Sequence, residues 1–361
     1  MDLSLVTSVF ETLRIPLPPR LTLLEARTLA SAHVPPFPPD MPALLAGVDS
    51  RELALHLQEV LLAVYPKDHV VQWVDEGKKQ EEQVADLHGD AFSANLCLYV
   101  PPLGEGTSFE SFAEIVAHLR APDGCPWDKE QTHESLRKHL LEESYEAISA
   151  IDSGEFADMR EEFGDLLLQI VLQSQIANEE GRFNVNQVVQ GIHSKIVRRH
   201  PHVFGDLKLD GVDGVLANWE KLKEKERGDK SDRKGLLDGV PAALPALSQA
   251  QEYQDRAARV GFDWNDIDGV LEKLKEEIDE VKRAETDFEL ASEIGDLFFA
   301  LVNLARWKKV DAESALRGTN NRFKRRFASV EAGAREQGRN LSELSLDEME
   351  VLWQKAKKSE N

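Results

Sequence analysis

The sequence predicts a mainly α-helical fold in which two copies of one helical-bundle domain follow a small α/β segment. Helical periodicity dominates the apolar pattern from residue 107 onward. A pair of acidic helices occurs twice in that part, and the motifs around each pair come in the same order. We therefore expect an α/β segment at 1–103, helical domains at 107–227 and 241–361, and a linker at 228–240.

The first segment differs in composition from the rest, since eight of the sixteen prolines lie between positions 16 and 42. A helix is expected at 50–64, ended by Pro66, because proline disfavours continuation of a helix. Runs rich in β-formers at 69–74 and 95–100 predict strands. The segment therefore has too few predicted strands to form a complete sheet enzyme.

The helical part begins at Thr107, which together with Glu110 predicts a capping box; this first helix ends before Pro122. A charged stretch at 224–234, which contains Gly228, is the expected hinge between the two domains. Further helices are expected at 130–151, 157–178, 186–200, 214–226, 242–259, 267–284, 288–308, 312–336 and 346–358.

Each repeat carries a helix with the pattern Glu-Glu-x-x-Glu, followed by a helix with the pattern Glu-x-x-Asp. Residues three and four apart lie on one face of a helix, so two such helices packed together bring four carboxylates close to one another. The acids are Glu143, Glu146, Glu162 and Asp165 in the first repeat, and Glu277, Glu280, Glu293 and Asp296 in the second.

These acids are candidate metal ligands because the helix that carries them is expected to be buried. The run at 166–172 is apolar nearly all round, which predicts a buried helix. Buried carboxylates cost several kcal/mol unless a partner compensates them, and Mg²⁺ prefers oxygen ligands of this kind. A solvated acidic face is the alternative, and the second copy of the pattern disfavours it.

Three further motifs recur around each acidic pair in the same order. An aromatic turn at 124–128 corresponds to one at 261–264, and a basic helix at 195–200 corresponds to one at 322–327. Each repeat then ends in Trp-x-x-x-Lys, with Trp219 and Lys223 in the first copy and Trp353 and Lys357 in the second.

Composition narrows the class of partner. A formal net charge of -22 argues against nucleic acid or an anionic membrane as the main partner, because phosphate backbones need clustered Lys and Arg. Cys97 and Cys125 are the two cysteines, so no disulfide framework is expected. We find no early run with the pattern of a signal peptide and therefore expect a cytoplasmic enzyme.

A carboxylate cage with a separate set of Arg and Lys suits a nucleoside triphosphate. Carboxylates hold Mg²⁺, guanidinium groups bind phosphate oxygens, and a tryptophan stacks on a base with little selectivity among bases. The Walker pattern is absent, as is a dinucleotide-binding glycine fingerprint after a strand. Di-iron bundles use Glu-x-x-His, which neither acidic helix contains. We therefore expect a site that binds the phosphates through metal ions rather than through a glycine-rich loop.

From about residue 107 to its end, the chain resembles the MazG family of all-α nucleoside triphosphate pyrophosphohydrolases. The resemblance implies Mg²⁺-dependent conversion of a nucleoside triphosphate to the monophosphate and pyrophosphate, with Mn²⁺ as a possible substitute, and helical domains that form a homodimer. Broad base tolerance, as in house-cleaning or nucleotide-pool control, fits a single stacking tryptophan. The motifs are those at 125–128, 198–204 and 260–264, and both acidic pairs.

The resemblance also assigns roles to individual residues. It makes the four acids of the second repeat metal ligands, and the four acids of the first repeat correspond to them. Arg322 stands where the family often has Lys, and His139 stands at the first-repeat position that matches Lys273. We therefore expect the second repeat to carry most of the turnover. The implied nucleotide-binding residues are Lys273, Arg322, Arg326, Trp353 and Lys357.

Residues 1–103 are similar to the C-terminal half of the tetrapyrrole methyltransferase-like domain that precedes MazG in some longer proteins. Residues 33–37 and 99–103 carry this similarity. The other half, with its glycine-rich cofactor loop, is missing, so we expect no methyl transfer. A non-catalytic acidic dimeric scaffold, or a regulatory binding protein, is the alternative to an enzyme. Mg²⁺-dependent release of pyrophosphate distinguishes the two.

Overall fold

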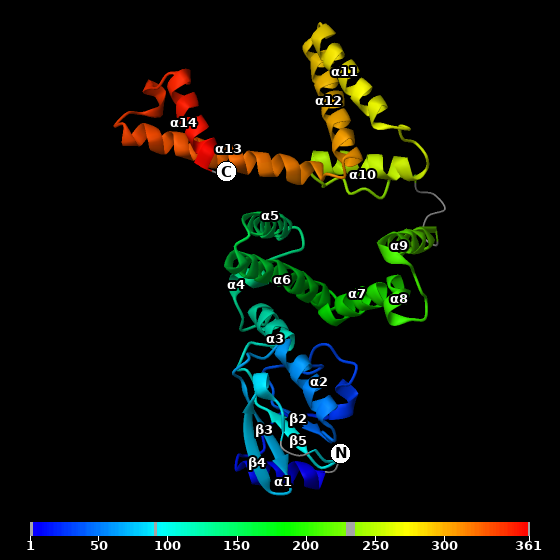
Figure 1. Cartoon of the computed structure of the whole chain (residues 1–361), viewed down its shortest axis with the longest axis vertical. Coiled ribbons are helices and arrows are strands. Elements are labelled where there is room, and N and C mark those ends of the chain that lie inside the picture. Colours follow the sequence, from blue (N-terminus) through cyan, green and yellow to red (C-terminus); the bar gives the residue numbers. More distant parts are fainter. Residues whose placement is uncertain (1–2, 90–91, 229–234, 360–361) are drawn as a thin grey trace. The chain divides into compact units, whose positions relative to one another are not determined.

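The computed structural model describes residues 3–89, 92–228 and 235–359, and it confirms a mainly helical fold with a small sheet near the N-terminus (Figure 1). The chain divides into two compact units, Met1–Ile196 and Val197–Asn361, and the division lies inside helix α7 (Val185–Arg199). The domain limits expected from the sequence stay a prediction, since part of the expected linker lies outside the described residues. No helix in the described ranges is long and apolar enough to cross a membrane.

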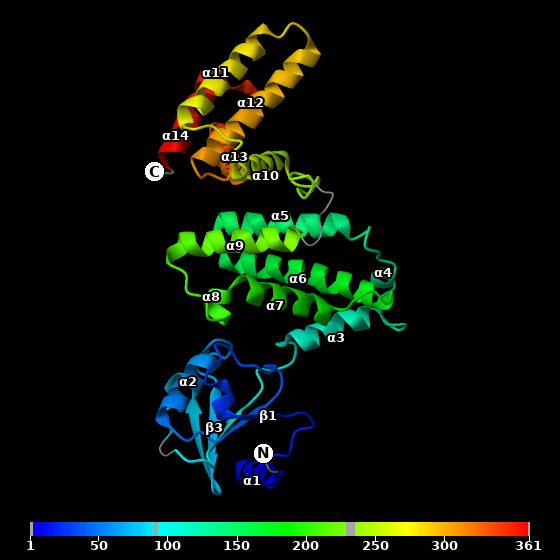
Figure 2. The same cartoon turned by 90° about the vertical axis from the view of Figure 1, so that its right-hand side faces the viewer.

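The first unit opens with a five-stranded mixed sheet in the order β1-β2-β5-β3-β4. Strands β1 and β2 pair in parallel, and the other neighbours are antiparallel. Helix α1 (Leu3–Leu13) packs on one face through Val6, Val9 and Phe10, and helix α2 (Arg51–Leu62) covers the other face (Figure 2). The strands are β1 (Thr22–Glu25), β2 (Ala43–Ala46), β3 (Val70–Asp75), β4 (Lys78–Gln83) and β5 (Cys97–Val100), with 3-10 turns at Ala26–Leu29 and Val84–Asp86.

The helix expected at 50–64 is confirmed as α2, where the Ser50 side chain accepts a hydrogen bond from the Leu53 amide. The two expected strands are β3 and β5. The sequence did not predict α1 or the other three strands. Strand β4 is polar throughout and lies at the sheet edge, so it lacks the apolar alternation by which strands are recognised.

The first helical domain continues in the same unit. Its acidic helices α5 and α6 form a hairpin whose first helix ends at Gly154, with φ of 76°. Helix α5 begins seven residues later than expected, because reciprocal side-chain bonds between Thr132 and Ser135 shape the chain before it. The helices are α3 (Phe109–Arg120), α4 (Pro126–Lys129), α5 (Arg137–Ser153) and α6 (Phe156–Glu179), followed by α7.

The capping box expected at Thr107 is wrong. Ser108 caps α3 instead, since its side-chain oxygen accepts a hydrogen bond from the Ser111 amide. The Thr107 hydroxyl donates to the Gly104 carbonyl and therefore belongs to the preceding turn. The Ser108 hydroxyl donates to Asp40, at 2.6 Å, so the cap also ties α3 to the α/β segment.

The second unit repeats the acidic hairpin. Helices α11 and α12 pack together, and a capping box between Thr286 and Glu289 opens α12. Helix α14 packs on α13 as a separate pair. The helices are α8 (Pro201–Phe204), α9 (Gly211–Gly228), α10 (Ala246–Arg259), α11 (Ile267–Arg283), α12 (Asp287–Trp307), α13 (Ala312–Glu336) and α14 (Leu346–Ser359), with a 3-10 turn at Leu341–Glu343.

Burial of the second acidic helix is one-sided, which corrects the expectation of burial all round. In α6, Val171 is 2% exposed, whereas Leu167 is 39% exposed. The exposed apolar residues recur at helical spacing and form a stripe, which is repeated in α12. We define this apolar stripe as Phe163, Leu167 and Ile170 in α6 and Ile294, Phe298 and Leu301 in α12. Each hairpin therefore presents an apolar face that its own unit does not cover.

Replacing Ser108 with Ala tests the corrected cap. The substitution removes the α3 cap and the bond to Asp40, and N-cap losses typically cost about 1 kcal/mol. We expect a lower midpoint of thermal unfolding. Thr107→Ala is the matched control and should change the unfolding free energy by less than about 0.5 kcal/mol. Equal losses in the two variants would restore Thr107 as a cap.

Two candidate metal centres

The second repeat brings three of its four predicted acids into one cluster. Glu277 and Glu280 lie one turn apart on α11, and Glu293 faces them from α12. One carboxylate oxygen from each lies within 4.8 Å of the other two. Glu277 is 3% exposed, and the other two are half-buried. The spacing and the oxygen donors suit a hard divalent cation such as Mg²⁺.

Glu277 is held by a lysine on its own helix. The Lys273 ammonium lies 2.7 Å from Glu277 Oε1 and 3.1 Å from Glu276, and these hydrogen bonds raise the pKa of Lys273. The other oxygen, Glu277 Oε2, is buried and has no hydrogen-bond partner among the described residues. A buried carboxylate oxygen is normally bonded, so this atom is open to a ligand.

The first repeat forms a matching cluster of Glu143 and Glu146 from α5 with Glu162 from α6, again with oxygens within 4.8 Å. Its surroundings differ, because Glu143 is half-buried and Glu146 is exposed. His139, at the position of Lys273, pairs with Glu142 at 3.2 Å. Among the described residues, the first cluster therefore has no counterpart of the lysine contact that holds Glu277.

Crowding of like charges shows in the acid pKa values. Burial raises the pKa of Glu293, and the charges of Glu280 and Asp296 raise it further. In the first repeat burial also raises the pKa of Glu143, followed by the charge of Asp165. The charges of Asp165 and Asp296 therefore act on the nearby glutamates, although neither aspartate belongs to a three-carboxylate group.

Glu162 behaves in the same way, since desolvation and then the charge of Glu146 raise its pKa. A bound cation would relieve this repulsion, because it favours the charged form of every carboxylate. The donor sets of both clusters therefore fit a divalent cation.

The predicted nucleotide-binding residues divide into two groups. Lys273 lies with the acids on α11, whereas Arg326 and Trp353 meet between α13 and α14, with the guanidinium carbon 5.9 Å from the ring centre. Phe323 lies 5.3 Å from the same ring. Figure 1 shows the α13–α14 pair apart from the α11–α12 hairpin.

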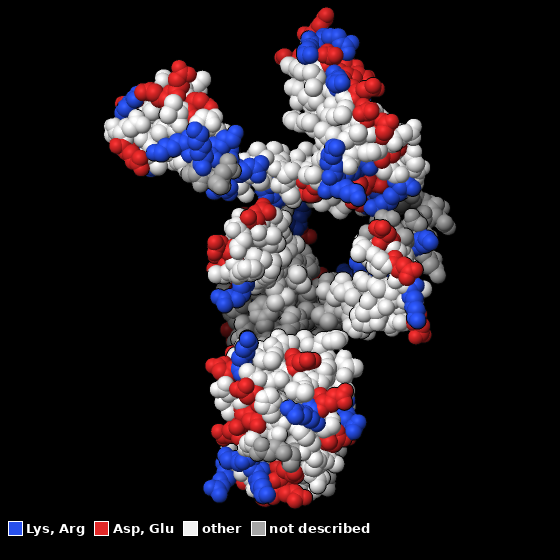
Figure 3. All heavy atoms as spheres, viewed as in Figure 1, with Lys and Arg blue, Asp and Glu red and all other residues white. Residues whose placement is uncertain are grey.

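Charge follows the same division. Lys and Arg gather over α13 and α14, and Asp and Glu line the outer side of α11 (Figure 3). Lys357 is exposed on α14, and Arg322 donates a hydrogen bond to Thr319 at 2.8 Å. Within the described chain, the cationic residues of α13 and α14 are therefore not gathered at the carboxylates.

The aromatic turn before the second hairpin supports the hairpin's base. Asp263 accepts hydrogen bonds from Arg306, at 2.6 Å, and from the Trp307 ring, at 3.1 Å. Trp264 packs so closely on Gly269 that a Cβ there would lie 2.3 Å from the ring. Sequence reasoning identified this motif and did not foresee that it fastens the start of α11 to the end of α12.

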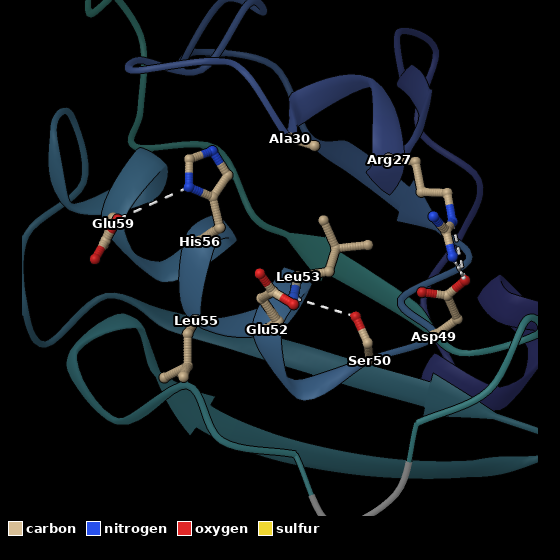
Figure 4. A pocket seen from close by; sticks show the side chains of 9 residues that line it. All are labelled: Arg27, Ala30, Asp49, Ser50, Glu52, Leu53, Leu55, His56 and Glu59. Carbon is tan, nitrogen blue, oxygen red and sulfur yellow. Dashed lines mark hydrogen bonds and ion pairs between the residues drawn. The ribbon is translucent and has the colours of Figure 1, made fainter.

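The α/β segment has a separate hollow of about 510 Å³ beside α2 (Figure 4). Arg27 and Asp49 pair at one side of it, at 2.5 Å, Ser50 is engaged in capping α2, and His56 contacts the Leu29 carbonyl. These polar groups bond to one another and to the backbone. None of the predicted site residues lines this hollow.

Removing one charge from the metal-free cluster should stabilise the fold. A carboxyl group whose pKa is raised in the folded state stabilises that state at a pH below its usual pKa. This contribution to the free energy of unfolding is lost as the pH rises through the raised pKa. We therefore expect Glu293→Gln to raise the unfolding midpoint in EDTA at pH 7 and to change little at pH 4. Glu272→Gln, at an exposed acid of α11, is the control. A gain for Glu293→Gln that is larger at pH 4 would contradict the repulsion.

Comparison with known proteins finds one family domain in each of the two repeats. The MazG nucleotide pyrophosphohydrolase domain matches residues 131–204 and 266–330, and each segment contains one acidic cluster. A nucleoside triphosphate pyrophosphohydrolase/pyrophosphatase of Thermotoga maritima is 45% identical over 253 residues, which cover 70% of this chain and 96% of that protein. The nucleoside triphosphate pyrophosphohydrolase of Escherichia coli K12 is 46% identical over 252 residues, covering 68% and 95%.

A longer relative reaches into the α/β segment. The uncharacterised protein YabN of Bacillus subtilis is 41% identical over 331 residues, which cover 88% of this chain and 67% of that protein. A match of this length cannot fit within residues 107–361, so the similarity includes part of residues 1–103.

Proposed function

The chain belongs to the MazG nucleotide pyrophosphohydrolase family, and from that premise we propose Mg²⁺-dependent hydrolysis of nucleoside triphosphates to monophosphate and pyrophosphate. Mn²⁺ is the alternative ion. One observation carries the proposal: Glu277, Glu280 and Glu293 present oxygens within 4.8 Å of one another, and the buried Glu277 Oε2 has no hydrogen-bond partner among the described residues. Base tolerance is broad, because one tryptophan face stacks on any base.

The residues of the second repeat divide the work. The three glutamates hold the ion, with Asp296 beside them; when bound, the ion neutralises phosphate charge and lowers the pKa of its water. Lys273 keeps Glu277 in place before binding and is placed to donate to a phosphate oxygen afterwards. The carboxylates, through the ion, and the Lys273 ammonium together orient the triphosphate for attack at the α-phosphorus.

Arg326 and Trp353 serve the two ends of the nucleotide, with the guanidinium on phosphate and the ring on the base. Arg322 and Lys357 add positive charge on the same helix pair. Because this pair stands apart from the α11–α12 hairpin, the complete site needs either a movement of α13 and α14 or the corresponding pair of a second copy.

We propose a homodimer that forms through the helical domains, because a second copy could complete the site and also cover the apolar stripe. The apolar stripe has the spacing of a helix face in both repeats, and the described residues of each unit leave its side chains more than a third exposed. A second copy that covers this face removes apolar surface from water.

The products test the chemistry. Incubation of a mixture of triphosphates with Mg²⁺ should release pyrophosphate and monophosphates, and EDTA should abolish the release. Diphosphate with orthophosphate would overturn the proposal. A dimer that releases neither product would favour the acidic scaffold.

The two repeats should contribute unequally. Glu277→Ala removes a buried ligand and should lower kcat/KM on the order of a hundredfold or more, with little change in fold. Asp296→Ala should act in the same direction. Glu143→Ala is the matched control in the first repeat, where the lysine contact is missing, and should keep most activity. The division of labour is wrong if the first-repeat variant proves as damaging.

Light scattering tests the dimer. The wild-type chain should show twice the mass of one chain, and Phe298→Glu should shift it toward monomer because it places charge in the apolar stripe. Leu17→Glu replaces an equally exposed apolar residue of the α/β segment and should leave the mass unchanged. A wild-type monomer at all concentrations would exclude the dimer.

A further inference from the structure

Two arginines at the end of α7 are bound by one glutamate at the end of α9. Arg198 donates to Glu226 Oε1 at 2.6 and 2.9 Å, and Arg199 donates to Oε2 at 2.5 Å. The Arg199 guanidinium carbon also lies 5.8 Å from the ring centre of Trp219. All four residues belong to the second unit and lie within the described chain.

The arginine and tryptophan of this group reproduce a feature of the second repeat. Arg326 lies over Trp353 at 5.9 Å, and the basic-helix and Trp-x-x-x-Lys motifs align these residues with Arg199 and Trp219. The second-repeat pair is the one to which we assign nucleotide contact. The residue aligned with Glu226 is Glu360, which lies outside the described residues.

The chemistry of this contact is that of an anion site. A carboxylate that bridges two guanidinium groups supplies a negative charge and two acceptor oxygens, and phosphate supplies the same groups to the same donors. The side chains of Arg199 and Glu226 are 15% and 24% exposed, so water screens the contact less than it would a surface pair. Hydrogen bonds from Arg199 and then Arg198 lower the pKa of Glu226 to about 2, and it is therefore charged at neutral pH.

We propose that Arg198, Arg199 and Trp219 form a binding site for the polyphosphate of a nucleotide and that Glu226 is a built-in competitor for that site. The identity of the ligand rests on the proposed function. Because Glu226 is attached to the same chain, it competes at a high effective concentration. A triphosphate carries more negative charge than one carboxylate and displaces it progressively as the triphosphate concentration rises, with an apparent Kd that the competition increases. Glu226 thereby sets the affinity of the first repeat for anions.

Calorimetric titration with inorganic tripolyphosphate tests the competitor. The full-length parent carries Arg322→Ala and Arg326→Ala, which removes both arginines that we assign to phosphate contact in the second repeat. Adding Glu226→Gln keeps the side-chain shape, removes the charge and should tighten binding about tenfold. Arg199→Ala on top of Glu226→Gln should abolish the gain. Asp213→Asn, an equal charge change at an exposed position of α9, should leave affinity unchanged.

Each outcome bears on the proposal. Unchanged affinity in Glu226→Gln with intact helix content by circular dichroism overturns it, as does an equal gain in Asp213→Asn. If Glu226→Gln lowers the helix content, Glu226→Asp replaces it as the test. The shorter side chain weakens the contact with the arginines and should increase the affinity for tripolyphosphate less than about tenfold. Unchanged affinity in Glu226→Asp overturns the proposal. If the wild-type chain released no pyrophosphate from triphosphates, the proposed function would be refuted. The titration would still test the competitor, because tripolyphosphate binding is measured without turnover.

Discussion

Like charges held close together are the constraint around which each helical hairpin is organised. Three carboxylate oxygens stay within 4.8 Å in both repeats, although burial and mutual repulsion raise the pKa of Glu143 and Glu293. Buried apolar residues such as Val270 and Leu274 fix the second hairpin from within, and the bonds of Asp263 close its base. The helices thus hold a geometry that the acids alone would disperse, and the divalent cation that we propose would turn the repulsion among the acids into attraction to the ion.

The contacts made one turn before each cluster differ between the repeats. Lys273 reaches Glu277, four residues on, in addition to Glu276, whereas His139 reaches Glu142, three residues on. The first contact holds the buried acid of the cluster in place, and the second engages an acid outside the cluster. A ligand whose position is fixed before binding loses less freedom when the ion arrives. The repeats therefore share their donors and differ in how well those donors are held.

The helices after residue 107 could be predicted because periodicity and caps are local properties of a sequence. The pairing of Glu277 with Glu280 follows from helical spacing for the same reason. Three other features depend on distant residues. The edge strand β4 has no apolar alternation, the capping residue Ser108 also bonds to the distant Asp40, and one side of α6 stays exposed among the described residues. The separation of the α13–α14 pair from the α11–α12 hairpin likewise depends on the direction in which α13 continues from the end of α12 (Figure 1).

Both kinds of binding group already hold an internal partner of opposite charge. Lys273 neutralises Glu277, and Glu226 offsets one of the two positive charges of Arg198 and Arg199. A free triphosphate meets a chain with a net charge of -22 and offers nothing to the carboxylates, whereas a bare cation offers nothing to the guanidinium groups. If the ion and the nucleotide bind as we propose, the metal–triphosphate complex, which carries both signs, would take the place of Lys273 at Glu277 and offer the released ammonium a phosphate oxygen. The internal ion pairs would then favour the complex over either component.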